Sequence, residues 1–305
     1  MFRILHALIL FFAVIPGYHA QENLIRFQQS EPLMGTTFNL IFYTTSQEHA
    51  TFAANLAFKR IKELNGIFSD YRKDSEVSKL SLNGTQRTPV SDDLWYLLKL
   101  SKKISRQSNG AFDISIGPLT KLWRRAIRQQ QFPDSAKISE AKNLVNYRWI
   151  KLYPSKQQVK LKKRGMKLDF GAIAKGYAID QAYEVLIEQG ISRALVDGGG
   201  DLYVGDAPPE PTNWDIKDHQ GKPLLIKDQT GVASSGDSYQ NLEWNGTRYS
   251  HIIDPHSGVG IQNSNVITVI ASKATIADVL SSTLSVLGEK RRYKLLRKYQ
   301  AEIIK

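Results

Sequence analysis

The chain of 305 residues contains no cysteine, and this absence limits how it can be stabilised. Disulfides, thiolate zinc sites, iron–sulfur clusters and cysteine nucleophiles are all excluded. A stable fold must therefore rest on an apolar core, and oxygen or imidazole must hold any bound metal. Apolar residues make up 42% of the chain and charged residues 23%, which are the proportions of a folded globular protein.

Residues 1–20 have the pattern of a bacterial export signal. Arg3 supplies a positive charge before an apolar run from Ile4 to Ile15, which is too short to span a bilayer. We expect cleavage after Ala20, so that residues 21–305 form the mature protein in the periplasm. The alternative is an uncleaved membrane anchor. Because the chain has no cysteine, it is not expected to be a lipoprotein.

The periodicity of apolar residues predicts one α+β domain after the signal. Alternating apolar residues predict strands, and apolar residues three and four apart predict helices. The expected strands cover residues 36–45, 148–153, 158–162, 167–170, 194–196, 202–204, 248–253 and 265–271. The expected helices cover residues 48–65, 91–109, 138–146, 172–189, 275–287 and 290–298. Strands often precede helices but also pair locally, which favours the α+β class.

The segment Leu168–Gly176 has features of an anion site. Asp169 precedes an expected helix start, and Lys175 lies in the first turn of that helix. The amino terminus of a helix offers unpaired N–H groups and the positive end of the helix dipole, and both suit a phosphate. The alternative is an ordinary strand-to-helix turn with a surface lysine.

Two further segments could line a ligand site. Three successive glycines, Gly198–Gly200, would let the backbone approach a flat or charged ligand closely, although a tight turn explains them equally well. Downstream, His251 is a candidate general base because its ordinary pKa range lies near neutrality. A metal site formed by His251, Asp254 and His256 is one alternative, and a buried histidine before an Asp-Pro turn is another.

The expected helix over residues 275–287 carries a candidate cation site. Asp278 and Ser282 are four residues apart and therefore share a face of this helix. A carboxylate and a hydroxyl suit a hard cation such as Mg²⁺. The alternative is structural, because Thr275 and Asp278 have the spacing of a capping box at the helix start.

Together these segments resemble the ApbE-type FAD:protein FMN transferases. The resemblance runs from Met34 to Gly288, nearly the whole mature chain, and its order and spacing fit as a set. It also rests on Met34-Gly35-Thr36, Phe68–Tyr71, Ser75–Ser78, Gly110–Ser115 and Ala233–Asp237. It implies an α+β catalytic domain with a mixed or antiparallel sheet, packed helices and a ligand cleft between two lobes.

The resemblance also implies a reaction. Members of this family split FAD and transfer its FMN half to a threonine or serine hydroxyl of another protein, with release of AMP and usually with Mg²⁺. Their targets carry a Ser/Thr-Gly-Ala-Thr type motif, which this chain lacks. We therefore expect the acceptor to be another exported protein, such as an electron-transfer subunit.

Residue roles follow from the same resemblance. Contacts to FAD are implied for Met34, Tyr71, Ala111, Phe112, Asp113, Asp169, Lys175 and Ile252 or Ile253. Metal ligands are implied at the backbone of Ala172 and Ser281 and at the side chains of Asp278 and Ser282. His251 is the implied base, and Lys175 would offset the charge of the diphosphate. Asp113 and Asp169 could either bind the ligand or support the metal site. The family usually has threonine in place of Ser282, whose hydroxyl can still coordinate.

Three other functions compete with this interpretation. An FAD pyrophosphatase would use the same site, with water in place of the acceptor hydroxyl. A non-catalytic flavin-binding protein would need neither the metal ligands nor the general base. The formal charge of +12 and the basic segment Lys290–Lys298 fit a nucleic-acid binder. However, Leu295 and Leu296 favour a helix packed on the domain, and the export signal disfavours a nucleic-acid partner.

Overall fold

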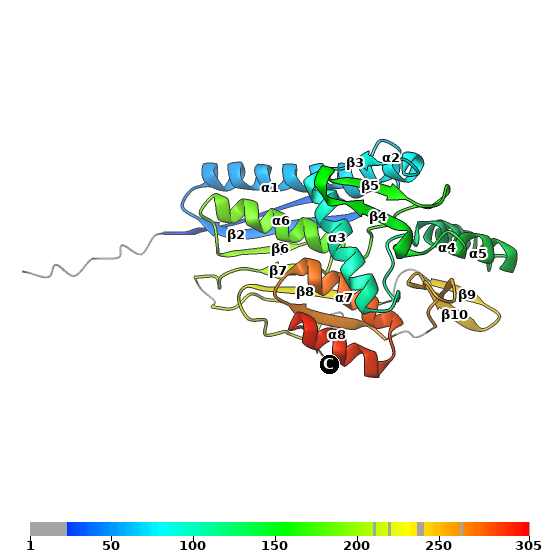
Figure 1. Ribbon diagram of the computed structural model, residues 1–305. Coiled ribbons are helices and arrows are strands. Elements are labelled where there is room, and N and C mark those ends of the chain that lie inside the picture. Colours follow the sequence, from blue (N-terminus) through cyan, green and yellow to red (C-terminus); the bar gives the residue numbers. More distant parts are fainter. Residues whose placement is uncertain (1–22, 210–211, 219–220, 237–240, 263–264, 305) are drawn as a thin grey trace, which may run out of the picture.

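The computed structural model describes residues 23–209, 212–218, 221–236, 241–262 and 265–304. Within these residues, an antiparallel sheet of seven strands lies at the centre of the molecule (Figure 1). Its strand order is β1 (Ile25–Leu33), β2 (Thr36–Thr44), β6 (Ala194–Asp197), β7 (Leu202–Val204), β8 (Thr230–Ser235), β13 (Ile267–Ala271) and β14 (Glu302–Ile304). Every neighbouring pair runs antiparallel.

The sheet is apolar on both faces, because side chains alternate between two layers along its central strands. On one face, Phe38, Leu40 and Phe42 join the main core, to which α1 (Gln47–Phe68), α6 (Ala174–Glu188) and α7 (Ala274–Val286) contribute. On the other face, Leu195, Leu202, Val204 and Val232 pack with Trp214, Ile216, Leu224 and Ile226 from the segment after β7. The helix layer therefore covers one side, and a long connection covers the other.

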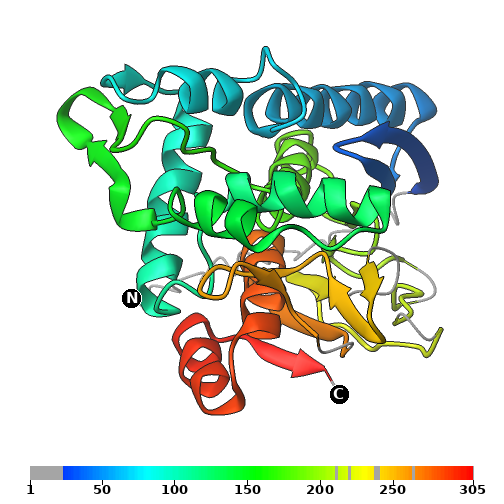
Figure 2. The same cartoon turned by 90° about the vertical axis from the view of Figure 1, so that its right-hand side faces the viewer.

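Two smaller groups of elements lie beyond this sheet. One contains α2 (Glu76–Asn83), α3 (Asp92–Gln107) and a small sheet of β3 (Thr88–Pro89), β5 (Gln158–Leu161) and β4 (Ile150–Tyr153). The other, seen in front in Figure 2, contains α4 (Gly117–Gln129), α5 (Ser135–Lys142), β9 (Asn241–Trp244), β10 (Thr247–Ser250), β11 (Ile253–Asp254) and β12 (Val259–Gly260). The second group has its own apolar cluster around Trp123.

The remaining helices are short or terminal. Two single-turn helices, η1 (Tyr147–Trp149) and η2 (Pro154–Lys156), flank β4. The basic helix α8 (Glu289–Tyr299) buries Leu295 and Leu296, so it packs on the domain as expected. In the described part of the chain, no helix has the length and apolar content that crossing a membrane requires.

Two carboxylates join the starts of α6 and α7. The side chain of Asp180, on α6, accepts hydrogen bonds from the backbone N–H groups of Ala274 (2.8 Å) and Thr275 (3.0 Å). In return, Asp278 on α7 accepts one from the N–H of Gly176 (2.9 Å). At the start of each helix, backbone N–H groups thus donate hydrogen bonds to an acidic side chain of the other helix. The expected capping box of Thr275 and Asp278 is therefore wrong.

Most of the expected elements are confirmed, and the exceptions have local causes. Residues 167–170 do not form a strand, because only Lys167 makes a bridge, to Ile116, and the N–H of Asp169 bonds the carbonyl of Ile114 instead. The helix expected over residues 138–146 begins earlier, where Asp134 caps it, and ends at Lys142. The strand expected over residues 248–253 is interrupted at residues 251–252.

The approach of α6 to α7 predicts a specific effect of Gly176→Ala. A Cβ at this position would lie 2.3 Å from the carbonyl oxygen of Ala274, so the helices must separate. We expect a loss of about 1–3 kcal/mol in the free energy of unfolding, measured by denaturant titration. The control is Gly66→Ala in α1, where a Cβ has open space and helix propensity predicts a gain of about 0.5–1 kcal/mol. Equal stability of the two variants would contradict this prediction.

Candidate functional site

The starts of α6 and α7 bring several of the expected site residues together. Lys175 forms an ion pair with Asp201, which directly follows the glycines of the β6–β7 turn. Asp201 also accepts a hydrogen bond from the N–H of Ser234 (3.1 Å) on β8. On α7, the Ser282 hydroxyl lies 3.3 Å from the hydroxyl of Ser235. The candidate anion site, the glycine turn and the candidate cation site are therefore parts of one region.

The charges of this region affect one another, because Asp201 and Asp278 are buried and Lys175 is partly buried beside them. Burial opposes the charge of Lys175, but Asp201 and Asp278 outweigh it and raise the lysine pKa. Burial raises the pKa of Asp278 to about 7, against the lowering effect of Lys175. Burial thus disfavours the charged form of Asp278, whereas Lys175 favours it. A divalent ion would favour its charged form.

The donor set around Asp278 fits Mg²⁺. The described residues contain no group of three or more His, Cys, Asp or Glu side chains that could hold a metal. Mg²⁺ commonly binds through one or two carboxylates together with substrate phosphates, so a single buried carboxylate with neighbouring oxygens is sufficient. Here the neighbours are the hydroxyl of Ser282 and the backbone of Ser281, whose carbonyl accepts the Ser285 hydroxyl (3.0 Å).

The turn at Met34 contacts the glycine turn. Met34 (φ 52°) and Gly35 (φ 81°) form the two-residue loop between β1 and β2, and both have left-handed backbone conformations. This conformation is uncommon for methionine, which suggests a constraint at the site. A Cβ at Gly199 would lie 1.9 Å from the Thr36 hydroxyl, so only glycine lets the two turns meet. The structure thus joins two motifs far apart in the sequence.

The Asp113 carboxylate accepts hydrogen bonds from its own loop and from the start of η1. Its buried carboxylate accepts hydrogen bonds from the N–H and hydroxyl of Ser115 (2.8 and 2.6 Å) and from the N–H of Tyr147 (2.7 Å). Burial raises the pKa of Asp113, although these hydrogen bonds oppose the shift. Phe112 and Ala111 beside it are also buried. These contacts hold the Asp113 carboxylate in place, and both of its expected roles stay predictions.

Asp169 is likewise held by protein groups, and one of them is a residue that the sequence did not point to. Its carboxylate accepts from the N–H of Gly171 (2.8 Å), the hydroxyl of Thr120 (2.7 Å) and the guanidinium of Arg124 (2.9 Å). Arg124 also lies over the ring of Tyr71, 4.4 Å from its centroid. Arg124 and Arg125 are adjacent on α4, and the sequence does not tell which of them faces Asp169.

His251 and Ile252 lie in the link between β10 and β11. Around them, the N–H of Ser250 bonds the carbonyl of Ile261 (2.8 Å), and the N–H of Ile252 bonds the Ser250 hydroxyl (3.0 Å). The His251 side chain is exposed, so the alternative of a buried histidine is wrong. The alternative metal site with Asp254 and His256 is also wrong, because these described residues form no metal-binding group. Instead, Asp254 accepts from the N–H of His256 (2.9 Å) in a turn.

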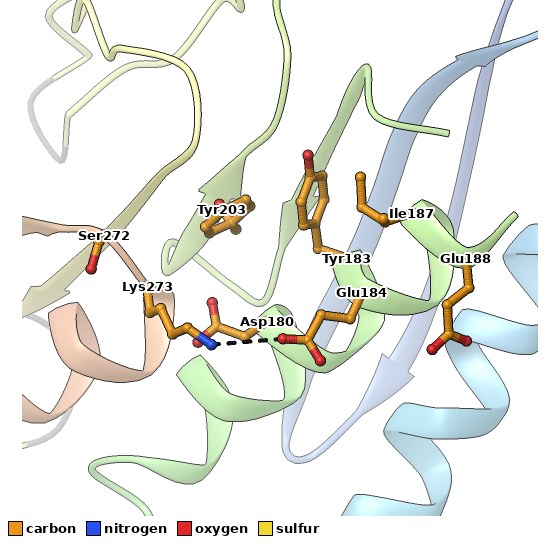
Figure 3. A pocket seen from close by; sticks show the side chains of 8 residues that line it. All are labelled: Asp180, Tyr183, Glu184, Ile187, Glu188, Tyr203, Ser272 and Lys273. Carbon is orange, nitrogen blue, oxygen red and sulfur yellow. Dashed lines mark ion pairs between the residues drawn. The ribbon is translucent and has the colours of Figure 1, made fainter. Parts of the chain in front are cut away.

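A separate pocket of about 330 Å³ lies along the carboxyl-terminal half of α6 (Figure 3). Tyr183 and Tyr203 line it with their ring centroids 4.5 Å apart, and Lys273 pairs with Glu184 at 3.7 Å. None of the residues that line it belongs to the expected site. The ligand cleft expected between two lobes stays a prediction.

Comparison with known proteins identifies the family and the fold. A model of the ApbE family matches residues 34–304. The FAD:protein FMN transferase of Haemophilus influenzae is 30% identical, over 87% of this chain and 82% of the relative. The Treponema pallidum enzyme of the same name is 28% identical, over 90% and 82%. Solved structures of the flavin transferase ApbE from Vibrio cholerae (TM-score 0.82, 25% identity, 92% and 93% coverage) and the flavinyl transferase ApbE of Pseudomonas stutzeri (0.80, 27%, 92% and 91%) have the same fold.

The coupled charges predict unequal effects of two lysine substitutions. Lys175→Met removes the partner of Asp201 and leaves Asp278 beside a second buried acid. We expect a loss of about 2–3 kcal/mol in the free energy of unfolding, measured with EDTA present. The loss is smaller than for a fully buried ion pair, because the lysine is only partly buried. The control is Lys273→Met, whose pair with Glu184 is about half exposed. Its change should stay within about 0.5 kcal/mol. Equal losses in the two variants would contradict the prediction.

Proposed function

The chain belongs to the ApbE family and is an FAD:protein FMN transferase, and from this premise we propose how its residues perform the transfer. The reaction uses Mg²⁺, and the acceptor is a threonine or serine hydroxyl of another exported protein. The observation that carries the proposal is the group formed by the partly buried Lys175 and the buried Asp201 and Asp278 near the starts of α6 and α7. Such a combination of cation, helix start and metal-binding carboxylate suits a dinucleotide diphosphate.

The diphosphate of FAD binds at the start of α6. Lys175 keeps its positive charge there because Asp201 and Asp278 raise its pKa. The helix dipole adds partial positive charge on the same side. Asp169 holds the N–H of Gly171 just before the helix and thereby fixes the backbone that approaches the ligand. These groups orient the diphosphate and offset its charge.

Asp278, Ser282 and the backbone of Ala172 and Ser281 would hold Mg²⁺. When bound, the ion supplies charge neutralisation at the diphosphate oxygens and so favours the departure of AMP. The protein holds the Asp278 carboxylate in place through the N–H of Gly176, which donates to Oδ2. The hydroxyl pair of Ser235 and Ser282 brings β8 to the same position.

His251 acts as the general base. It takes the proton of the acceptor hydroxyl, whose oxygen forms a bond to the phosphorus on the FMN side of FAD. The bond from that phosphorus to the bridging oxygen breaks, and AMP leaves with the electron pair. The exposed position of His251 suits this role, because the acceptor is a side chain of another protein and must reach the base from outside. Export to the periplasm is part of the same proposal.

The first test measures the transfer of FMN and its dependence on the metal. Purified protein without residues 1–20 is incubated with FAD, Mg²⁺ and an acceptor domain that bears the Ser/Thr-Gly-Ala-Thr motif. Intact mass should show one added FMN and an equal amount of AMP. Asp278→Ala should slow the transfer at least about a hundredfold, because a direct metal ligand matters at least as much as an outer-shell partner. EDTA should have the same effect.

Glu184→Gln is the control for this experiment, because it removes an exposed acid of the separate pocket, and it should leave the rate unchanged. AMP with free FMN and an unlabelled acceptor would instead identify a pyrophosphatase. Bound FAD without any product would contradict a catalytic role.

The second test separates the base from the binding site. His251→Ala should lower kcat about 10²–10⁴-fold, because the acceptor hydroxyl loses its proton acceptor. The Kd for FAD, followed by flavin fluorescence, should stay within a few-fold of the unsubstituted value. His49→Ala is the control, since His49 pairs with Thr44 at the start of α1 (2.7 Å). An unchanged kcat in His251→Ala would exclude this histidine as the base.

A further inference from the structure

Arg124 connects three groups around the proposed FAD site. Its guanidinium pairs with Asp70 and, at 2.9 Å, with Asp169. The same guanidinium lies 4.4 Å from the centroid of the Tyr71 ring. Asp70 and Tyr71 follow the end of α1, Asp169 precedes α6, and Arg124 itself comes from α4. One side chain therefore ties together three segments that are distant in the sequence.

Arg124 compensates two carboxylates that lie close together. Burial and the charge of Asp169 raise the pKa of Asp70, and Arg124 opposes both effects. The side chain of Asp169 is only 6% exposed, so solvent does little to screen it. With Arg124 present, the side chains of Asp70, Asp169 and Arg124 together carry a net charge of −1. Without Arg124, two acids would face an incoming anionic dinucleotide.

Arg124 also determines how Tyr71 is presented. The tyrosine is 77% exposed, an unusual position for a large aromatic side chain. Because the guanidinium covers one face of its ring, the exposed surface includes the opposite face. A planar heteroaromatic ring can stack on such a face, as it does on aromatic platforms elsewhere. The guanidinium restrains the tyrosine before the ligand arrives, which lowers the entropic cost of binding.

These contacts reach the diphosphate end of the site. Asp169 accepts from Arg124 and Thr120 through Oδ2 and from the N–H of Gly171 through Oδ1. Gly171 stands three residues before α6 begins at Ala174. Arg124 is thus linked, through one carboxylate, to the backbone proposed to approach the phosphates. The exposed ring and the helix start are held in a fixed relation.

We propose that Arg124 is a positioning residue for FAD. It holds Tyr71 with one ring face open for a planar ring of the dinucleotide, and it offsets one of the two negative charges of Asp70 and Asp169 near the diphosphate. This inference rests on the proposed function, and it adds a residue that acts on substrate binding and not on bond cleavage. It assigns Arg124 an effect on the KM for FAD, whereas the effect on kcat is small.

The test compares Arg124→Gln with a matched neighbour. Arg124→Gln should raise both the KM and the Kd for FAD about tenfold, which corresponds to about 1.4 kcal/mol, and change kcat less than about threefold. Arg124→Lys keeps the charge without the planar guanidinium. Its KM and Kd for FAD should therefore lie between those of Arg124→Gln and those of the unsubstituted protein. Arg125→Gln is the control, because Arg125 is exposed on the same helix and bonds Gln129 there (3.1 Å). It should leave both constants unchanged.

A second substitution distinguishes charge compensation from general damage. In the Arg124→Gln background, Asp70→Asn removes the acid that has lost its partner, so FAD affinity should recover by about three- to tenfold. A merely structural role for Arg124 predicts no such recovery. If Arg124→Gln fails to fold, Arg124→Lys and the double variant carry the same comparison. Thermal unfolding of each variant identifies such a failure.

The outcomes separate this inference from the proposed function. If the unsubstituted protein binds FAD and releases AMP but Arg124→Gln binds FAD equally well, only the role of Arg124 is overturned. Equal weakening in the Arg124 and Arg125 variants, or no recovery with Asp70→Asn, overturns it as well. If the unsubstituted protein binds no FAD, the proposed function fails and this inference fails with it.

Discussion

The reciprocal contact between α6 and α7 is the constraint on which the site depends. Each helix has amino-terminal donors satisfied by an acid of the other, through Asp180 in one direction and Asp278 in the other. This exchange requires the backbones to be very close, and only glycine at position 176 allows that distance. A helix start buried without such partners would be costly. The same arrangement therefore stabilises the core and brings Lys175 next to Asp278.

The chemistry of the site follows from charged side chains that the fold places close together. Lys175 lies partly buried beside the buried acids Asp201 and Asp278, and the pKa values of Lys175 and Asp278 are both raised there. Such a region suits an ionic ligand, because the charges of the ligand can pair with those of the protein. Asp113 and Asp169 differ, since their carboxylates are already saturated by backbone and side-chain donors. These contacts fix the shape of the segments around residues 113 and 169.

Local patterns predicted much of this structure, and long-range contacts account for what they missed. The alternation of Phe38, Leu40 and Phe42 predicted the strand that they occupy, and Ser91 was recognisable as a helix cap. The cap of α7 was not recognisable, because Asp180 lies about 94 residues before the groups that it accepts from. Arg124 was missed for the same reason, since its partners come from two other segments. The family resemblance supplied site residues that spacing alone left ambiguous.

The order of strands in the sheet also affects how the protein is made. The hairpin of β1 and β2 is synthesised early, but the partner of its inner edge is β6, and Asn39 bonds Asp197 across 158 residues. At about 5–20 residues per second, that partner emerges from the ribosome about 8–30 s after the hairpin. During this time an apolar strand presents unpaired backbone groups to any other chain nearby. The hairpin therefore reaches its native pairing only once residues 194–197 are present, so a sheet edge made early in synthesis is completed late.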